Sequence, residues 1–176
     1  MAVHEAGHAV VAETLFPGQV TEVAIIEPWR ARWFKFFNID VNGFCKYTSM
    51  IDIRPTLDTA KNEICIMLSG AAAVDFFFPD LKLGGNRSDF SKAEELIQKT
   101  VNNGLSEAGP VTWNMLTEEQ RNKIAQNIMK SEYERARKII SEHKDEILAV
   151  SKELKEKEHL TGEELRNILS SSPSKQ

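Results

Sequence analysis

The sequence predicts a mainly helical α+β fold, and three features of its pattern support that class. Apolar residues recur at three- and four-residue steps over residues 57–74 and 124–140, as on one face of an α-helix. Residues 20–26 are rich in β-branched side chains and precede Pro28, which is typical of a strand. The chain of 176 residues is 41% hydrophobic, which is enough for a packed core. We therefore expect a helical domain with a small sheet or hairpin and a bundle of helices at its C-terminal end.

The N-terminal half is expected to alternate between helices and strands. The apolar run at residues 1–16 predicts a first helix, and Pro17 and Gly18 predict its end. The Asn42-Gly43 pair is typical of a tight turn between two strands. The sequence predicts, in order, strands at residues 20–26, 34–41 and 44–48 and helices at residues 57–78 and 88–101.

The C-terminal third is expected to consist of long helices. The sequence Thr-Glu-Glu-Gln at residues 117–120 is a capping box that starts one helix, and Thr-Gly-Glu-Glu at residues 161–164 caps a last short one. The charged run at residues 152–158 predicts a solvated helix face. Residues 170–176 are polar and are predicted to be disordered.

Composition narrows the class of function. A net charge of -4 gives no electrostatic basis for nucleic-acid binding. The two cysteines, Cys45 and Cys65, lack a CxxC spacing and are expected to be free thiols in a reducing compartment. No apolar stretch is long enough to span a bilayer and no secretory signal is visible, so the sequence predicts a soluble, cytoplasmic chain.

Residues 29–37 combine two Trp and three Phe with three basic residues. One interpretation is a hairpin that packs on the core. The other is a rim that contacts substrate, a membrane surface or a partner.

The strongest chemical signal is His4-Glu5-Ala6-Gly7-His8, inside the predicted first helix. One helical turn separates His4 from His8, so both imidazoles project from the same face and can hold one Zn²⁺ at about 2.0–2.1 Å. Glu5 lies beside the first ligand, where it can take a proton from water that the metal has made acidic. This is the HExxH pattern of zinc peptidases.

A buried helix with two hydrogen-bonded histidines is the structural alternative to a metal site. Two observations favour the metal. The helix is apolar nearly all round and is expected to be buried, where two His and a Glu need strong partners. Gly7 in the middle of the helix costs about 1 kcal/mol relative to Ala, so we expect a close packing contact there.

Catalytic zinc usually takes a third protein ligand, and the pattern alone leaves its identity open. His143 and His159 lie in charged segments that we expect to be C-terminal helices, where a solvated His is usual. Glu22 and Glu27 flank the predicted strand, without the second helix that would carry a thermolysin-type ligand. Asp89 opens a helix after Gly84-Gly85, but an acid in the first turn is also common because of the helix dipole.

The chain resembles the peptidase domain of the FtsH-type AAA proteases, which are membrane-anchored, ATP-dependent zinc metalloproteases. That family has H-E-A-G-H on a helix and, far downstream, a segment T/S-G-A-x-N-D-[LF]-x-x-A-T whose Asp is the third ligand. The matching segment here is Gly-Asn-Arg-Ser-Asp-Phe-Ser-Lys-Ala at residues 85–93, so the resemblance implies Asp89 as the third ligand. Residues 133–136 and 154–164 also resemble the family, and the likeness runs from Val3 to about Leu169.

Three departures from the family pattern stand out. The family's Leu-Gly-Gly-Arg-Ala-Ala-Glu-Glu corresponds to Leu-Ser-Gly-Ala-Ala-Ala-Val-Asp at residues 68–75. Residues 29–37 look like an insertion, and neither the family's transmembrane segment nor its ATPase module lies within these 176 residues.

Motif and resemblance together predict a zinc metalloendopeptidase that hydrolyses unfolded polypeptide segments. His4, His8 and Asp89 are the expected metal ligands and Glu5 the expected general base. The resemblance implies a hexamer and an AAA ATPase module, missing or separate. Residues 1–110 would form the zinc peptidase core, residues 111–169 a C-terminal helical subdomain and residues 170–176 a disordered tail. The alternative is a catalytically degenerate, peptidase-like module that acts in protein binding or assembly; hydrolysis of a non-peptide amide would use the same site.

Overall fold

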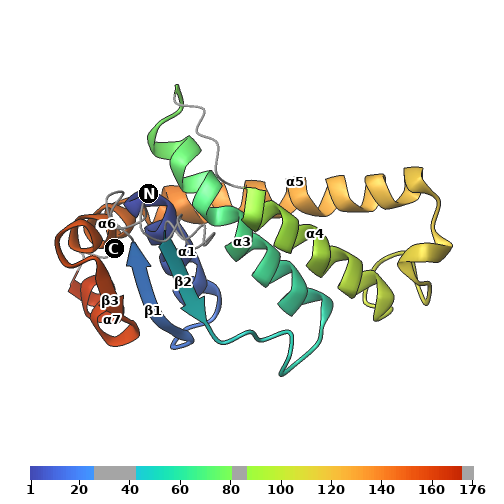
Figure 1. Ribbon diagram of the computed structural model, residues 1–176, viewed down its shortest axis with the longest axis horizontal. Helices are drawn as coiled ribbons and strands as arrows, with labels where there is room; N and C mark the ends of the chain where they lie inside the picture. Colours follow the sequence, from blue (N-terminus) through green and yellow to red (C-terminus); the bar gives the residue numbers. More distant parts are fainter. Residues whose placement is uncertain (26–42, 81–86, 172–176) are drawn as a thin grey trace, which may run out of the picture.

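The computed structural model describes residues 1–25, 43–80 and 87–171. Within these ranges the chain is mainly helical with one small antiparallel sheet, so the predicted α+β class is confirmed (Figure 1). The elements are α1 (Ala2–Leu15), β1 (Val20–Ile25), β2 (Gly43–Tyr47), α3 (Leu57–Phe77), α4 (Arg87–Asn102), η1 (Trp113–Met115), α5 (Glu118–Glu142), α6 (Lys144–Lys157), β3 (His159–Thr161) and α7 (Gly162–Ser171).

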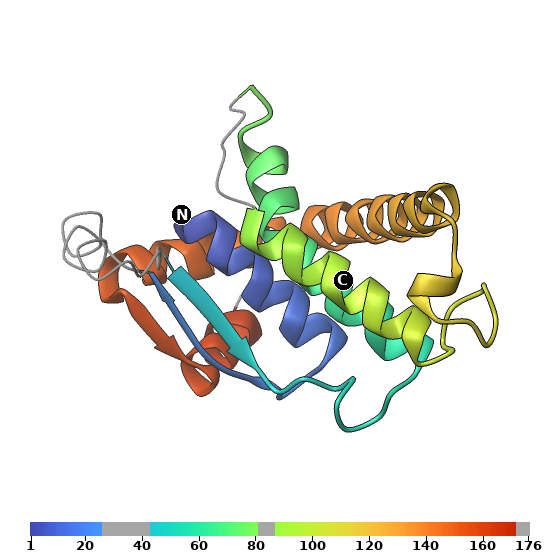
Figure 2. The same ribbon diagram turned by 45° about the vertical axis from the view of Figure 1, so that its right-hand side comes forward.

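Helix α1 is the central element of the fold. It contacts α3 and α6 as well as β1 and β2, and in Figure 2 it lies between β2 and α4. Eleven of its residues, Glu5 and His8 among them, are buried, as expected for a helix that is apolar nearly all round. The chain leaves α1 through Gly18, whose φ of 80° favours glycine and whose N–H donates to the Glu13 carboxylate at 2.7 Å.

The sheet has the order β2-β1-β3, with both neighbours antiparallel to β1. Strand β3 was not predicted, and His159 lies in it rather than in a helix, so that part of the sequence interpretation is wrong. Three residues are too few for a period-2 pattern, and β3 forms because Leu160, fully buried, pairs with Val23. The predicted strand at residues 34–41 and the aromatic-basic stretch at residues 29–37 lie outside the described residues.

The buried side chains form two apolar clusters. One joins α1 and the sheet to α6 and α7 through side chains such as Ile147 and Leu165. The other joins α3, α4 and α5 through Leu68, Ile97 and Ile128. The first cluster unites α1 with the C-terminal helices α6 and α7. The boundary at residue 110 between a peptidase core and a C-terminal subdomain stays a prediction.

Several predicted boundaries are confirmed. Thr117 and Gln120 form the expected capping box at the start of α5, and Thr161 and Glu164 exchange the corresponding bonds before α7. Helix α7 ends at Ser171, so Ser170 and Ser171 are helical rather than part of a disordered tail. Residues 172–176 lie outside the described ranges.

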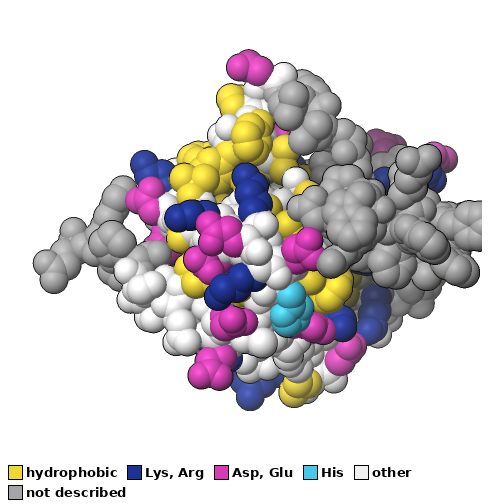
Figure 3. Space-filling model, turned by 60° about the vertical axis from the view of Figure 1, so that its left-hand side comes forward, with side chains coloured by type: hydrophobic (Ala, Val, Ile, Leu, Met, Phe, Trp, Pro, Cys, Tyr) yellow, Lys and Arg dark blue, Asp and Glu magenta, His cyan; other side chains and the backbone are white. Residues whose placement is uncertain are grey.

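The surface near the C-terminal helices is charged. Figure 3 shows basic and acidic side chains interspersed on one face of the molecule. Residues 152–158 are exposed or partly exposed except for the buried Leu154, in keeping with the predicted solvated face. Cys65 is buried and Cys45 partly so, and both thiols are free. In the described part of the chain, no helix has both the length and the apolar character needed to cross a membrane.

Candidate metal centre

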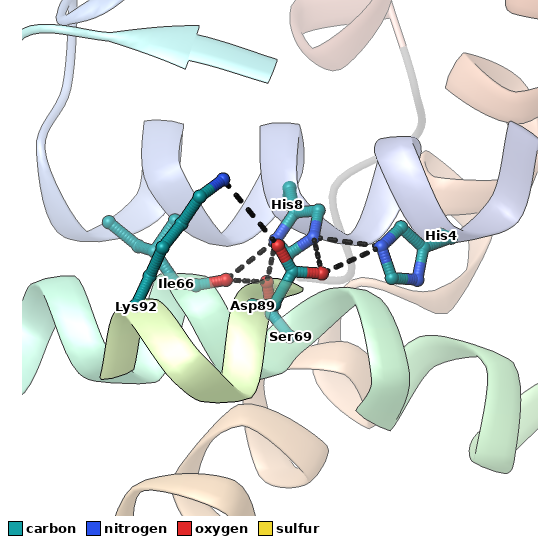
Figure 4. Close-up of polar contacts among 6 residues, drawn as sticks. All are labelled: His4, His8, Ile66, Ser69, Asp89 and Lys92. Carbon is teal, nitrogen blue, oxygen red and sulfur yellow. Dashed lines mark hydrogen bonds and ion pairs between the residues drawn. The ribbon is translucent and has the colours of Figure 1, made fainter. Parts of the chain in front are cut away.

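Three side chains that are far apart in the sequence meet between α1 and α4. His4 and His8 project from one face of α1 with ring centroids 4.7 Å apart, and Asp89 reaches them from the first turn of α4 (Figure 4). The Nε2 atoms of His4 and His8 lie 3.1 Å apart. Asp89 Oδ2 lies 3.2 Å from His4 Nε2 and 3.5 Å from His8 Nε2. The predicted ligand set therefore converges, and no other group of described His, Cys, Asp and Glu residues does so.

These spacings fit a four-coordinate metal ion. Donor atoms at about 2.0–2.1 Å from a tetrahedral ion lie about 3.3 Å from one another. The three separations of 3.1, 3.2 and 3.5 Å bracket that value. Two imidazole nitrogens and one carboxylate oxygen are also a donor set that suits Zn²⁺.

Contacts behind His8 fix its orientation. Its Nδ1 lies 2.7 Å from the backbone carbonyl oxygen of Ile66 and 3.3 Å from Ser69 Oγ, whose hydroxyl donates to the same carbonyl at 2.7 Å. A carbonyl can only accept, so His8 carries its proton on Nδ1 and leaves Nε2 free to bind a metal. Ile66 and Ser69 both belong to α3, which therefore helps to set the tautomer of a ligand on α1.

Gly70 on α3 is a functional position that the sequence interpretation missed. A Cβ atom at Gly70 would lie 2.4 Å from His8 Nε2 and 2.7 Å from His4 Nε2. Any side chain there would occupy the space in front of the ligand nitrogens. The run of small residues around Gly70 in an apolar helix was the available signal, but it does not say what approaches it.

Gly7 has the packing reason that the sequence led us to expect. A Cβ atom on Gly7 would lie 2.6 Å from Ala73 Cβ and 2.9 Å from the Ser69 carbonyl oxygen. Helices α1 and α3 therefore approach closely at this point, which brings Gly70 against the imidazoles.

Glu5 is almost completely buried, with 6% of its surface exposed. A Cβ atom at Gly43, the first residue of β2, would lie 2.6 Å from Glu5 Oε1, so β2 begins against this carboxylate. Burial raises the pKa of the Glu5 carboxyl, and the neighbouring His8 and His4 offset this only in part. A carboxylate with a raised pKa is the better proton acceptor near neutral pH.

The pKa values of Asp89 and His8 are shifted in opposite directions by their mutual contact. Burial alone would raise the pKa of Asp89, but hydrogen bonds to His4 and His8 outweigh it and hold that pKa well below its usual range. Burial alone would lower the pKa of His8, but contact with Asp89 and the charge of Glu5 raise it overall.

The other ligand candidates lie elsewhere. His143 Nδ1 is 3.7 Å from Glu146 Oε1 at the junction of α5 and α6. His159 Nε2 is 3.1 Å from Glu22 Oε2 on the sheet. Glu27 falls outside the described residues.

Together, the fold and the site define a helical metallopeptidase-like domain, and comparison with known proteins agrees. The family model of Peptidase family M41 matches residues 1–168, and the chain belongs to this family.

Curated relatives carry consistent names. The chain is 29% identical to ATP-dependent zinc metalloprotease FtsH 2 of Thermoanaerobacter sp. (strain X514), over 95% of this chain and 32% of the relative. It is 29% identical to the FtsH protease of Streptobacillus moniliformis, over 98% of this chain and 26% of the relative. It is 28% identical to the FtsH protease of Helicobacter pylori, over 97% of this chain and 29% of the relative. The chain thus spans about a third or less of the length of these relatives.

Proposed function

We propose that this chain is a zinc-dependent metalloendopeptidase module that cuts unfolded polypeptide segments. His4, His8 and Asp89 are the proposed ligands of Zn²⁺, the metal named for the relatives, and Glu5 is the proposed general base. The observation that carries the proposal is that three donor atoms, two on α1 and one on α4, lie 3.1–3.5 Å apart, with Glu5 on α1 beside them.

The chemistry divides between the metal and the protein. His4, His8 and Asp89 would hold the zinc ion, which would supply the Lewis acidity that makes water acidic near neutral pH and polarises a carbonyl group. Glu5 accepts a proton from the attacking water and passes it to the nitrogen of the leaving amine.

Strand β2 is the proposed binding edge for substrate. Strand β1 is paired on both sides, whereas β2 pairs only with β1 among the described strands. An extended chain added to β2 would form backbone hydrogen bonds beside Glu5, at the end where Gly43 lies. Such binding depends on the backbone of the substrate more than on its side chains. The substrate has to be unfolded at the cleavage point, because its backbone groups must be free to pair with β2.

The relatives' names include ATP dependence, and we propose that an AAA ATPase module feeds polypeptide to this domain. We further propose a hexameric assembly with the C-terminal helices in residues 111–169 as the contact surface. A gel-filtration and light-scattering measurement of the chain with and without such a module tests the assembly.

A degenerate module that only binds proteins is the second candidate, and the departure at residues 68–75 is the observation behind it. In that segment Asp75 accepts a hydrogen bond from the Tyr133 hydroxyl, which ties α3 to α5. Against this candidate, the chain retains Glu5 beside the two histidines, and a purely structural module does not need it.

Cleavage of casein, a loosely folded protein, separates the two. The native chain and Glu5→Gln are compared with zinc present, and the zinc content of each is measured by mass spectrometry. Cleavage by the native chain alone, with equal zinc in both, is the expected result. Equal zinc with no cleavage by either protein would favour the binding module, and loss of zinc from Glu5→Gln would make Glu5 a ligand.

A further inference from the structure

Lys92 brings a positive charge to the edge of the metal centre. It lies on α4 one turn after Asp89, and its Nζ is 4.0 Å from Asp89 Oδ1, the carboxylate oxygen opposite the one that contacts both imidazoles. Figure 4 shows the Lys92 side chain extending from α4 toward α1, on the same side of α4 as Asp89.

The Lys92 ammonium group retains capacity for another partner. Its contact with Asp89 is longer than a hydrogen bond, and 64% of the side chain is exposed. Lys99, two turns further along α4, differs because its Nζ donates to Asp52 Oδ1 at 3.1 Å. An ammonium group has three N–H donors, so Lys92 can bind an incoming anion without giving up Asp89.

Lys92 lies beside the course that a peptide bound at the proposed β2 edge would take over the metal centre. Strand β2 begins against Glu5, and α4 lies on the other side of α1 (Figure 2). A peptide added to the β2 edge and crossing the ligand atoms of His4 and His8 would reach Asp89 and then Lys92. The ammonium group would meet the peptide close to the scissile bond.

We propose that Lys92 is a specificity-determining residue that binds a carboxylate of the peptide substrate beside the metal centre. This inference rests on the proposed peptidase function. The carboxylate belongs either to an Asp or Glu side chain near the scissile bond or to a free C-terminus, because both present the same anion to the ammonium group.

Peptide binding to the zinc-loaded Glu5→Gln chain tests the inference without relying on turnover. The first probe is a neutral fluorescent decapeptide that contains several Asn residues and has an amidated C-terminus. The other probes are the same peptide with each Asn in turn replaced by Asp, and the neutral peptide with a free C-terminus. An exposed charge pair corresponds to about a two- to five-fold change in Kd at low salt. At least one acidic peptide should bind tighter by that factor, and the position of the effect identifies which carboxylate is recognised.

Variants in the same background assign the effect to Lys92. Lys92→Ala should remove the preference, Lys92→Glu should reverse it, and Lys99→Ala should leave it unchanged. The preference should also weaken as salt is raised. An unchanged preference in Lys92→Ala would overturn the proposal.

Zinc affinity, measured in parallel by chelator competition, tests the alternative that Lys92 only positions Asp89. If Lys92→Ala weakened zinc binding while the acidic preference stayed the same, Lys92 would instead be a positioning residue for Asp89, and the proposal would be wrong. If the preference appeared but the native chain cleaved none of the peptides, the peptidase function would fail and the carboxylate site would stand.

Discussion

Substitution of Gly70 by alanine should damage the metal site without unfolding the domain. The added methyl group would lie 2.4 Å from His8 Nε2, 2.6 Å from His4 Cε1 and 2.7 Å from His4 Nε2. Optimal contact between non-bonded heavy atoms is about 3.5 Å or more, so the imidazoles must move by about 1 Å. Metal coordination tolerates deviations of only about 0.2 Å.

The expected magnitude follows from that displacement. Loss of a group that only orients a ligand lowers metal affinity by about 10- to 100-fold, and Gly70→Ala displaces two ligands at once. Zinc affinity should therefore fall by at least about 100-fold, which is about 2.7 kcal/mol. Alanine stabilises a helix by about 0.5–1 kcal/mol relative to glycine, while overpacking costs about 1–3 kcal/mol. The free energy of unfolding of the metal-free chain should therefore fall by about 2.5 kcal/mol or less.

A chelator competition titration measures the zinc affinity, and urea denaturation measures the free energy of unfolding. Gly7→Ala is the matched control, because its methyl group meets Ala73 and the Ser69 carbonyl rather than the imidazole nitrogens. The control should lose stability by overpacking and keep much more of its zinc affinity than Gly70→Ala. Zinc binding by Gly70→Ala within three-fold of the native chain would show that the space at Gly70 is not needed for the metal site.

Two further predictions concern protonation. The pKa of Asp89 is lowered in the folded chain, so its contribution to stability is present above its ordinary pKa of about 4 and is lost in acid. The pKa of His8 is raised in the folded chain, so its contribution to stability is lost as the pH rises above about 6.5. The metal-free native chain should therefore exceed Asp89→Asn in thermal stability most clearly between about pH 4 and 6.5. Zinc needs neutral imidazoles, so it should raise Tm more at pH 7.5 than at pH 5.5. A zinc effect on Tm that is larger at pH 5.5 would contradict the assignment of His4 and His8 as ligands. Burial raises the pKa of the Cys65 thiol to about 11, so iodoacetamide at pH 8 should label Cys65 slowly in the native chain and rapidly in urea, as followed by mass spectrometry. Equally fast labelling in both states would show that Cys65 is accessible.

Local features of the sequence predicted local features of the structure. The one-turn spacing of His4 and His8 places both rings on one face of α1, and the capping box at Thr117 marks the start of α5. Helical periodicity identified both α3 and α5. Helix α5 buries one stripe that includes Ala136 and Ile140, whereas α3 is buried on nearly all sides over residues 63–74. Asp89 needed the family resemblance in addition, since an acid in the first turn of a helix is also explained by the helix dipole.

Features that depend on contacts between distant segments could not be predicted. Strand β3 exists because of its pairing with β1, and three residues carry too little pattern of their own. The roles of Gly70 and of the Ile66 carbonyl arise from the close approach of α3 to α1, about sixty residues away in the sequence. The sequence likewise could not decide between the two candidate binding strands, whereas pairing on both sides of β1 favours β2.

The proposed chemistry depends on one zinc ion held by two side chains of α1 and one of α4. Anomalous X-ray diffraction at the zinc absorption edge, from crystals of the zinc-loaded chain, tests it most directly. A single strong peak within about 2.0–2.2 Å of His4 Nε2, His8 Nε2 and an Asp89 carboxylate oxygen is the predicted result. A peak at other side chains, or one bound by the two histidines with Asp89 turned away, would contradict the claim.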